Sequence, residues 1–153
     1  MTTPKYVADL EASYGVPSQQ GFGSSVFYQT LRAEENLESV ALTKYQYFLG
    51  GKWSDAYQAA WARIYTRLSD ASRNIEAELR SIGDANARSS ASMILDDVES
   101  AATAKQALSA AYDDPDVTEL NVHSIGDGEA MSGLVVSGRR SSGESTFLVF
   151  LMD

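Results

Sequence analysis

The sequence predicts an α+β domain in which N-terminal helices, including a long antiparallel helical hairpin, precede a C-terminal three-stranded antiparallel meander. Two observations lead to this fold class. Apolar residues recur every three or four positions over residues 53–82 and again over residues 84–112, which is the spacing of one face of an α-helix. After residue 116 the pattern changes to short β-branched and apolar runs separated by glycine turns.

The beginning of the chain is predicted to be an N-terminal arm and loop, residues 1–25, followed by a single α+β domain, residues 26–153. Residues 4–14 have the spacing of a short helix, whereas residues 15–25 are rich in glycine, serine and glutamine and include Pro17. Residues 26–49 return to helical spacing, and Gly50 and Gly51 end that predicted helix.

The main predicted helix covers residues 53–82. Ser54 or Asp55 can cap its first turn, and Gly83 is typical of the residue that follows a helix. We expect its apolar residues to face the interior; they are Trp53, Tyr57, Trp61, Ile64, Leu68, Ala71, Ile75, Leu79 and Ile82.

The second arm of the predicted hairpin covers residues 84–112, and Asp84 can cap its start. The short connection makes the two helices antiparallel neighbours, which would place Arg67 near Glu99 on the surface. Pro115 lies directly after this segment and prevents the helix from continuing.

The three predicted strands are residues 117–125, 130–137 and 145–152. The first alternates between polar and apolar residues, as a strand with one exposed face does. The third is apolar at every position from Phe147 to Met152, which predicts burial on both faces. In so small a sheet, we expect another subunit to cover one of them.

Composition limits the classes of function. The chain has 153 residues, no cysteine, a formal charge of −9 and a pI near 4.5, so thiol chemistry is excluded and affinity for nucleic acid or an anionic membrane is disfavoured. No apolar run is long enough to span a bilayer and no signal peptide is recognisable, so we expect a cytoplasmic protein. We find no cofactor motif and no metal-binding pattern.

Four aromatic residues, Trp53, Tyr57, Trp61 and Tyr65, stand four positions apart in the main predicted helix. Such a row can line a pocket for an aromatic or sugar-like ligand, or it can form the core of the elbow at Gly50. The sequence leaves both interpretations open.

His123 is the only histidine and therefore the only candidate for an imidazole general base, with Glu119 on the same strand face to orient it. The alternative, which we favour, is a solvent-facing residue of an alternating strand. Arg139 and Arg140 lie at a predicted hairpin tip, where two guanidinium groups can bind phosphate or carboxylate oxygens or can simply keep the tip soluble.

Three functions follow from these features. The first is a non-enzymatic interaction or assembly protein that forms a homo-oligomer through its C-terminal strand and helical faces, with a protein partner as a further possibility. The second is a small-molecule-binding or catalytic cup, because the order of helices and sheet is similar to that of cystatin-like and NTF2-like folds, although no motif carries the resemblance. The third is an acidic inhibitor that occupies a nucleic-acid site on a partner, which rests on charge alone.

Overall fold

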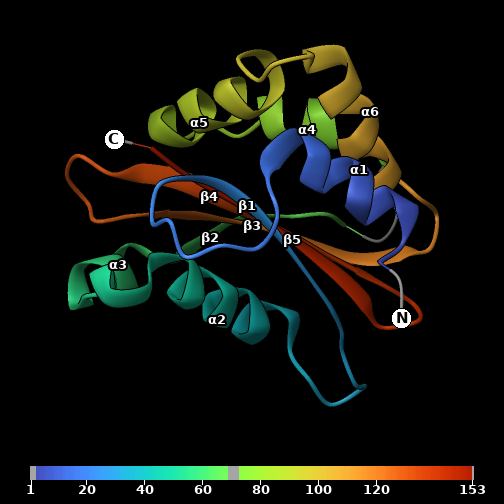
Figure 1. The fold of residues 1–153 in the computed structure, drawn as a ribbon, viewed down its shortest axis with the longest axis horizontal. Helices are drawn as coiled ribbons and strands as arrows, with labels where there is room; N and C mark the ends of the chain where they lie inside the picture. The colour runs from blue at the N-terminus through green and yellow to red at the C-terminus, as the bar shows by residue number, and fades with distance from the viewer. Residues whose placement is uncertain (1–2, 69–72, 153) are drawn as a thin grey trace.

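A five-stranded antiparallel sheet with helices on both faces forms the protein. Figure 1 shows these layers in the computed structural model, which describes residues 3–68 and 73–152. The elements are α1 (Lys5–Tyr14), β1 (Gly23–Thr30), α2 (Leu37–Leu49), the 3-10 turn η1 (Gly50–Lys52), α3 (Asp55–Ala60), β2 (Ala62–Thr66), α4 (Ile75–Arg80), α5 (Ala85–Asp96), α6 (Ala101–Tyr112), β3 (Val117–Gly126), β4 (Ser132–Arg140) and β5 (Glu144–Met152).

The strand order is β1-β5-β4-β3-β2, and every neighbouring pair is antiparallel. Helices α1, α4, α5 and α6 cover one side of the sheet, here called the α5 face, and α2 and α3 cover the other, the α2 face (Figure 1). Each side has its own apolar core. No helix within the described residues is both long and apolar enough to cross a membrane.

The prediction of a long helical hairpin is wrong. Residues 53–82 contain the short helix α3, the edge strand β2 and the short helix α4. Residues 62–66 include an isoleucine, a tyrosine and a threonine, which favour a strand once β3 offers an edge. The apolar ladder is therefore divided: Trp53, Tyr57 and Trp61 pack on the α2 face, whereas Ile64, Ile75, Leu79 and Ile82 pack on the α5 face.

Two members of that ladder do not join either core. Leu68 is 69% exposed, because the chain has left β2 and has not yet entered α4. Ala71 lies outside the described residues. A spacing of three or four residues thus matched a helix across a segment in which the chain changes direction several times.

The helix predicted over residues 84–112 is two helices, α5 and α6. Asp84 caps α5 as predicted, its carboxylate accepting a hydrogen bond from the Ala87 amide at 2.9 Å. The break lies before Ala101, where Ser100 has a φ of 55°, a left-handed conformation that ends the continuous helical path.

The helix predicted over residues 26–49 is also wrong in residues 26–36, nearly half of its length. Residues from Gly23 to Thr30 form the edge strand β1, because Val26, Phe27 and Tyr28 are β-branched or aromatic and pair with β5. Only the later part is helical, as α2, and Asn36 caps it by accepting a hydrogen bond from the Ser39 amide. The sheet therefore has two strands, β1 and β2, beyond the three that the sequence predicted.

The three C-terminal strands do follow one another as antiparallel neighbours, but they do not form a sheet of their own. β5 lies in the interior of the sheet, between β1 and β4. Leu148 and Phe150 belong to the core of the α5 face, and Phe147 and Val149 belong to that of the α2 face. Both faces of β5 are thus covered by helices of the same chain, and no second subunit is required to bury them.

The N-terminal residues also belong to this packing. Val7, Leu10 and Tyr14 of α1 are buried in the core of the α5 face, and the Tyr14 hydroxyl donates to the Ile94 carbonyl at 2.7 Å. Tyr112 of α6 is fully buried and donates to the Val136 carbonyl at 3.0 Å, which ties the helical layer to the sheet.

A buried ion cluster joins β2, α4 and the end of α6. The Arg67 guanidinium donates to both carboxylate oxygens of Glu78, at 2.6 and 2.9 Å, and to Asp113 at 3.1 Å. Arg67 does not pair with Glu99, because the predicted hairpin that would bring them together does not exist. These contacts fasten Arg67, directly after β2, to α4 and to the end of α6.

Candidate functional site

His123 lies on β3 with its side chain on the α2 face and is 0% exposed. The expectation of a solvent-facing imidazole is wrong. The strand does alternate, so that Leu120 and Val122 point to the α5 face, but α2 and α3 cover the opposite face as well. An alternating strand in a sheet that is covered on both sides places its polar residues in a core.

The imidazole of His123 stacks on the indole of Trp61, with ring centres 4.1 Å apart and planes 12° apart. Its Nε2 lies 3.0 Å from Oε1 of Glu38, but the approach does not have the direction of a hydrogen bond. Nδ1 has no hydrogen-bond partner among the described residues. Nδ1 is therefore buried and unsatisfied, which is rare in folded proteins, whereas Nε2 keeps a contact with the Glu38 carboxylate that favours the protonated ring.

The charge state of His123 follows from this environment. Burial lowers the pKa of the imidazole below its usual value, because the charged form loses its hydration. The carboxylate of Glu38 acts in the opposite direction, and the guanidinium of Arg63 lowers the pKa further. His123 is consequently a neutral proton acceptor at neutral pH, with a carboxylate beside it that would stabilise the protonated ring.

Two cross-strand rows of side chains surround the imidazole on the α2 face. In one row Arg63 of β2, His123 of β3 and Val135 of β4 are directly opposite one another. The neighbouring row consists of Thr66, Asn121 and Ser137. Thr66 donates to Oδ1 of Asn121 at 2.9 Å, and Oγ of Ser137 is buried without a partner in the part of the chain that the structure describes.

Ser137 and His123 are thus diagonal neighbours on adjacent strands, and both carry unsatisfied polar atoms. Glu119, which we expected to orient His123, instead accepts a long hydrogen bond of 3.5 Å from the Asn121 amide. Glu38 takes its place from α2, a helix whose relation to β3 cannot be read from the sequence. Asn121, Ser137 and Glu38 were not predicted, and no spacing signal in the sequence identifies them.

The aromatic residues form a continuous series of rings that ends at His123. Tyr57 stacks on Trp53 at 6.4 Å, Trp53 meets Tyr45 edge to face at 5.3 Å, and Tyr45 stacks on Trp61 at 5.8 Å. The structure therefore brings Trp53, Tyr57 and Trp61 together.

Tyr65, the fourth predicted aromatic ligand-binding residue, is not part of this series. It packs on the α5 face and donates to Oε2 of Glu78 at 2.5 Å. Burial, together with that hydrogen bond to the Glu78 carboxylate, raises the pKa of Tyr65 to about 12. Tyr65 is therefore a member of the buried ion cluster around Arg67.

Trp61 is the cover of the imidazole. It follows α3, a helix of six residues with no buried side chain, and the indole is itself partly exposed. The side chain of Glu38 is 41% exposed and that of Arg63 is 57% exposed. His123 thus lies directly beneath the partly exposed ring of Trp61, which follows a short helix without buried side chains.

Arg139 and Arg140 do not form a joint anion site. Arg139 donates to the carbonyls of Glu35 and Arg32, at 2.7 and 2.8 Å, whereas Arg140 donates to the Ala110 carbonyl and lies 3.8 Å above the ring of Tyr6. One guanidinium contacts the segment before α2 and the other contacts α6 and α1, on opposite faces of the sheet. Both are used to fasten these elements to the end of β4.

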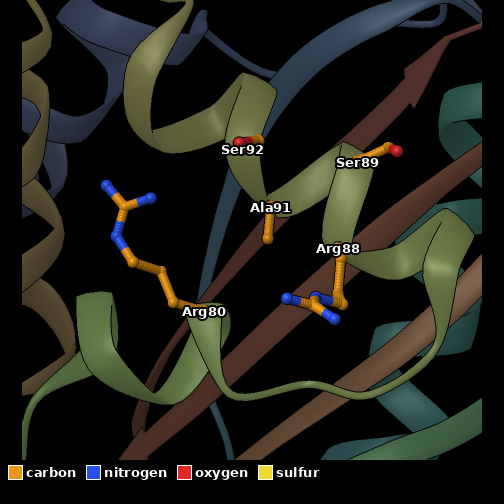
Figure 2. Close-up of a pocket in the computed structure, with 5 residues that line it drawn as sticks. All are labelled: Arg80, Arg88, Ser89, Ala91 and Ser92. Atoms are coloured by element: carbon orange, nitrogen blue, oxygen red, sulfur yellow. The ribbon is translucent and has the colours of Figure 1, made fainter.

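A recess of about 380 Å³ between α4 and α5 is lined by arginine and serine side chains. Figure 2 shows Arg80 and Arg88 on opposite sides of Ala91, with their guanidinium groups apart. Arg80 is already held by Glu76 and Asp96, at 3.1 and 2.9 Å, so its charge is neutralised. Because only Arg88 is left without such partners among the described residues of this recess, we expect weaker anion binding than two unpaired arginines would give.

No group of three or more histidine, cysteine, aspartate or glutamate residues that could hold a metal ion occurs in residues 3–68 and 73–152. A scan against protein-family models and searches of curated proteins and of solved structures each find no match. The chemistry of the site must therefore be argued from its own residues. Those residues are a neutral imidazole, a carboxylate, a guanidinium and a row of amide and hydroxyl groups beneath stacked aromatic rings.

Proposed function

We propose that the protein binds a small planar molecule with hydrogen-bonding groups at His123, and that the indole of Trp61 moves aside to admit it. The observation that carries this proposal is the fully buried imidazole, whose Nδ1 has no hydrogen-bond partner among the described residues and whose Nε2 has only a poorly directed contact with Glu38. Leaving a buried polar group unsatisfied costs about 1–3 kcal/mol of stability. Groups that reduce stability in this way are concentrated at functional sites.

The shape of the ligand follows from the ring stack. The indole of Trp61 stacks with both His123 and Tyr45 and is nearly parallel to both rings. A planar molecule in the same position keeps both stacking contacts. To satisfy the imidazole as well, the ligand must extend beyond the stack and place a hydrogen-bond donor or acceptor in the plane of the His123 ring, because a group stacked on the face of the ring cannot reach its nitrogens.

The charged groups around His123 favour transfer of a proton from a bound molecule to the imidazole. His123 is neutral because burial lowers its pKa, so it can accept a proton from a bound molecule. Glu38 at 3.0 Å would then stabilise the imidazolium. Arg63 lies 3.8 Å from the same carboxylate oxygen, so a cation and an anion stand together beside the imidazole near the surface.

Planar heteroaromatic fragments provide the test, with indole, benzimidazole and nicotinamide as probes. Because Trp53 and Trp61 are the only tryptophans, the Trp53→Phe variant leaves Trp61 as the single fluorophore. We expect at least one probe to change Trp61 fluorescence and to shift the ring signals of His123 in NMR spectra at millimolar concentration.

The matched control is His123→Phe, which keeps an aromatic ring for Trp61 to stack on but removes both nitrogens. It should stay folded and lose the response. Probes that bind the control as well as they bind the native site, or that shift only residues away from His123, would show that the imidazole is a structural residue.

An interaction function is the second candidate. β5 lies in the interior of the sheet and is paired along both edges, so assembly through this strand would require β1 or β4 to leave. The edge strand β1 is the observation that favours an interaction function, and it is treated below. Nucleic-acid mimicry still rests on the net charge alone, and we do not propose it.

A further inference from the structure

β1 is an edge strand whose outer side is only partly occupied. Within the sheet its other edge pairs with β5. On the outer side the Val26 amide donates to the Gly15 carbonyl at 2.9 Å, so the loop after α1 protects the first half of the strand. Because neighbouring residues of a strand direct their amides to opposite edges, Tyr28 and Thr30 direct theirs outward like Val26. Neither amide has a partner on that side in the described part of the chain.

A groove of about 450 Å³ lies beside this free half, between β1, α2 and the loop after α1. Its lining residues are Pro17, Phe27, Tyr28, Thr43, Lys44 and Tyr47. Phe27 and Tyr47 meet edge to face with ring centres 5.8 Å apart, and Tyr47 is 51% exposed. Val16 and Phe22, also strongly exposed, lie in the loop nearby. Three of the five large apolar side chains that are most exposed therefore belong to this region.

The charge of the groove is opposite to that of the rest of the protein. Residues 15–30 contain no charged side chain at all, in a chain of net charge −9. Lys44 is the only charged residue of the groove. Its ammonium donates to Oε1 of Gln29 at 2.7 Å and forms no ion pair with any described residue. Burial lowers the pKa of Lys44, so a carboxylate beside it would stabilise the charged form.

We propose that this edge binds an extended segment of another protein, in which a large apolar residue and a carboxylate are two positions apart. The segment adds a strand to β1 through the outward groups of Tyr28 and Thr30, about 4.8 Å from the strand axis. Residues two apart in a strand point to the same face. The apolar side chain therefore enters between Phe27 and Tyr47 while the carboxylate meets Lys44.

A second copy of this chain does not fit the groove equally well. Its own β1 carries no acidic residue, so Lys44 would remain without a carboxylate. Two chains of charge −9 also repel each other. The complementary partner is an acidic and apolar segment of a different protein, and this surface is separate from the His123 site.

The probe is an acetylated and amidated octapeptide of threonine with leucine at its fourth position and glutamate at its sixth. Its controls have glutamine at the sixth position, or glutamate moved to the fifth so that it points to the other face. Binding is followed by two-dimensional amide NMR of the full chain. We expect the amides of Tyr28 and Thr30 to shift, and the glutamate peptide to bind about threefold to tenfold tighter than either control at low salt.

Two protein variants separate the roles of charge and backbone. Lys44→Gln should remove the preference for glutamate, whereas Lys52→Gln, which removes the same charge outside the groove, should keep it. Thr30→Pro removes the outward amide and should weaken all peptides, and its amide spectrum shows whether the fold is intact. If Thr30→Pro does not fold, the Lys44→Gln and Lys52→Gln pair still decides the question.

Several results would overturn the proposal. One is equal affinity for the three peptides in the native protein, and another is a glutamate preference that survives Lys44→Gln. Peptide-induced amide shifts that lie only outside β1 would also contradict the proposal. Concentration-dependent broadening of the Tyr28 and Thr30 amides, with a dimer in light scattering, would show that a second copy occupies the edge instead.

Discussion

Replacing His123 by phenylalanine should make the protein more stable. The substitution keeps a ring of similar size against Trp61 and removes two buried nitrogens, of which Nδ1 has no hydrogen-bond partner among the described residues and Nε2 has only a poorly directed contact with Glu38. An unsatisfied buried polar group reduces stability by about 1–3 kcal/mol. Some of that gain is offset by the lost attraction between His123 and Glu38, so we expect an increase of about 1–2 kcal/mol in the free energy of unfolding near neutral pH.

The pH dependence of the free energy of unfolding gives a second, independent test of the buried imidazole. Burial lowers the pKa of His123 in the folded protein, whereas in the unfolded chain it is near 6.5. Between these two values the unfolded chain binds more protons, so the free energy of unfolding falls as the pH falls below about 6.5. The slope from this one group is at most about 1.4 kcal/mol per pH unit. The stability gap between variant and native protein should therefore widen toward acid pH and stop widening below the folded-state pKa.

Urea unfolding followed by circular dichroism, at a series of pH values from about 7.5 down to 5, measures both effects in one experiment. His123 is the only histidine, so a difference in slope between the two proteins belongs to this residue. A variant that is less stable than the native protein would show that the imidazole is satisfied in solution. Parallel pH profiles would show that its pKa does not change on folding.

Three further predictions test the cover, the buried ions and the corrected course of the chain. Trp61→Ala should expose the imidazole and raise the pKa of His123 toward about 6.5, as its NMR titration will show. Arg67→Met should lower the free energy of unfolding by about 3–5 kcal/mol, because it leaves buried carboxylates without their partner; a loss below about 1 kcal/mol in urea would argue that water reaches them. Leu79→Ala should lower the free energy of unfolding by about 2–5 kcal/mol and Leu68→Ala by less than about 0.5 kcal/mol. Equal losses for the two variants would show that Leu68 is buried.

The C-terminal strands could be predicted because their signals are local. β-branched runs and glycine turns specify a strand within a few residues, and β3, β4 and β5 lie close to the predicted positions. β2 could not be predicted in the same way, since its five residues are too short to show a period of two. Ile64 and Leu68 happen to continue the helical spacing of Trp61, although the three residues have different surroundings.

The surroundings of His123 could not be predicted for a different reason. The sequence identified His123 and the aromatic row, but the exposure of a strand face depends on what covers it. That cover comes from α2 and α3, which end 68 and 57 residues before β3 begins. Glu38 becomes a partner of the site only through this long-range packing, so no local pattern could have revealed it, whereas Ser137 lies beside His123 through the register of the neighbouring strands β3 and β4.

The position of β5 sets the order in which the protein can be assembled during synthesis. This strand comes after every other helix and strand that the structure describes, yet it lies between β4 and β1, which precedes it by more than a hundred residues. Until residues 144–152 leave the ribosome, β1 has no neighbour within the sheet and β4 has one bare edge. The earlier helices can form while translation continues, but the sheet closes only afterwards and across a loop of more than a hundred residues. We therefore expect slow folding that begins late, and a nascent chain that depends on chaperones to shield its unpaired strands.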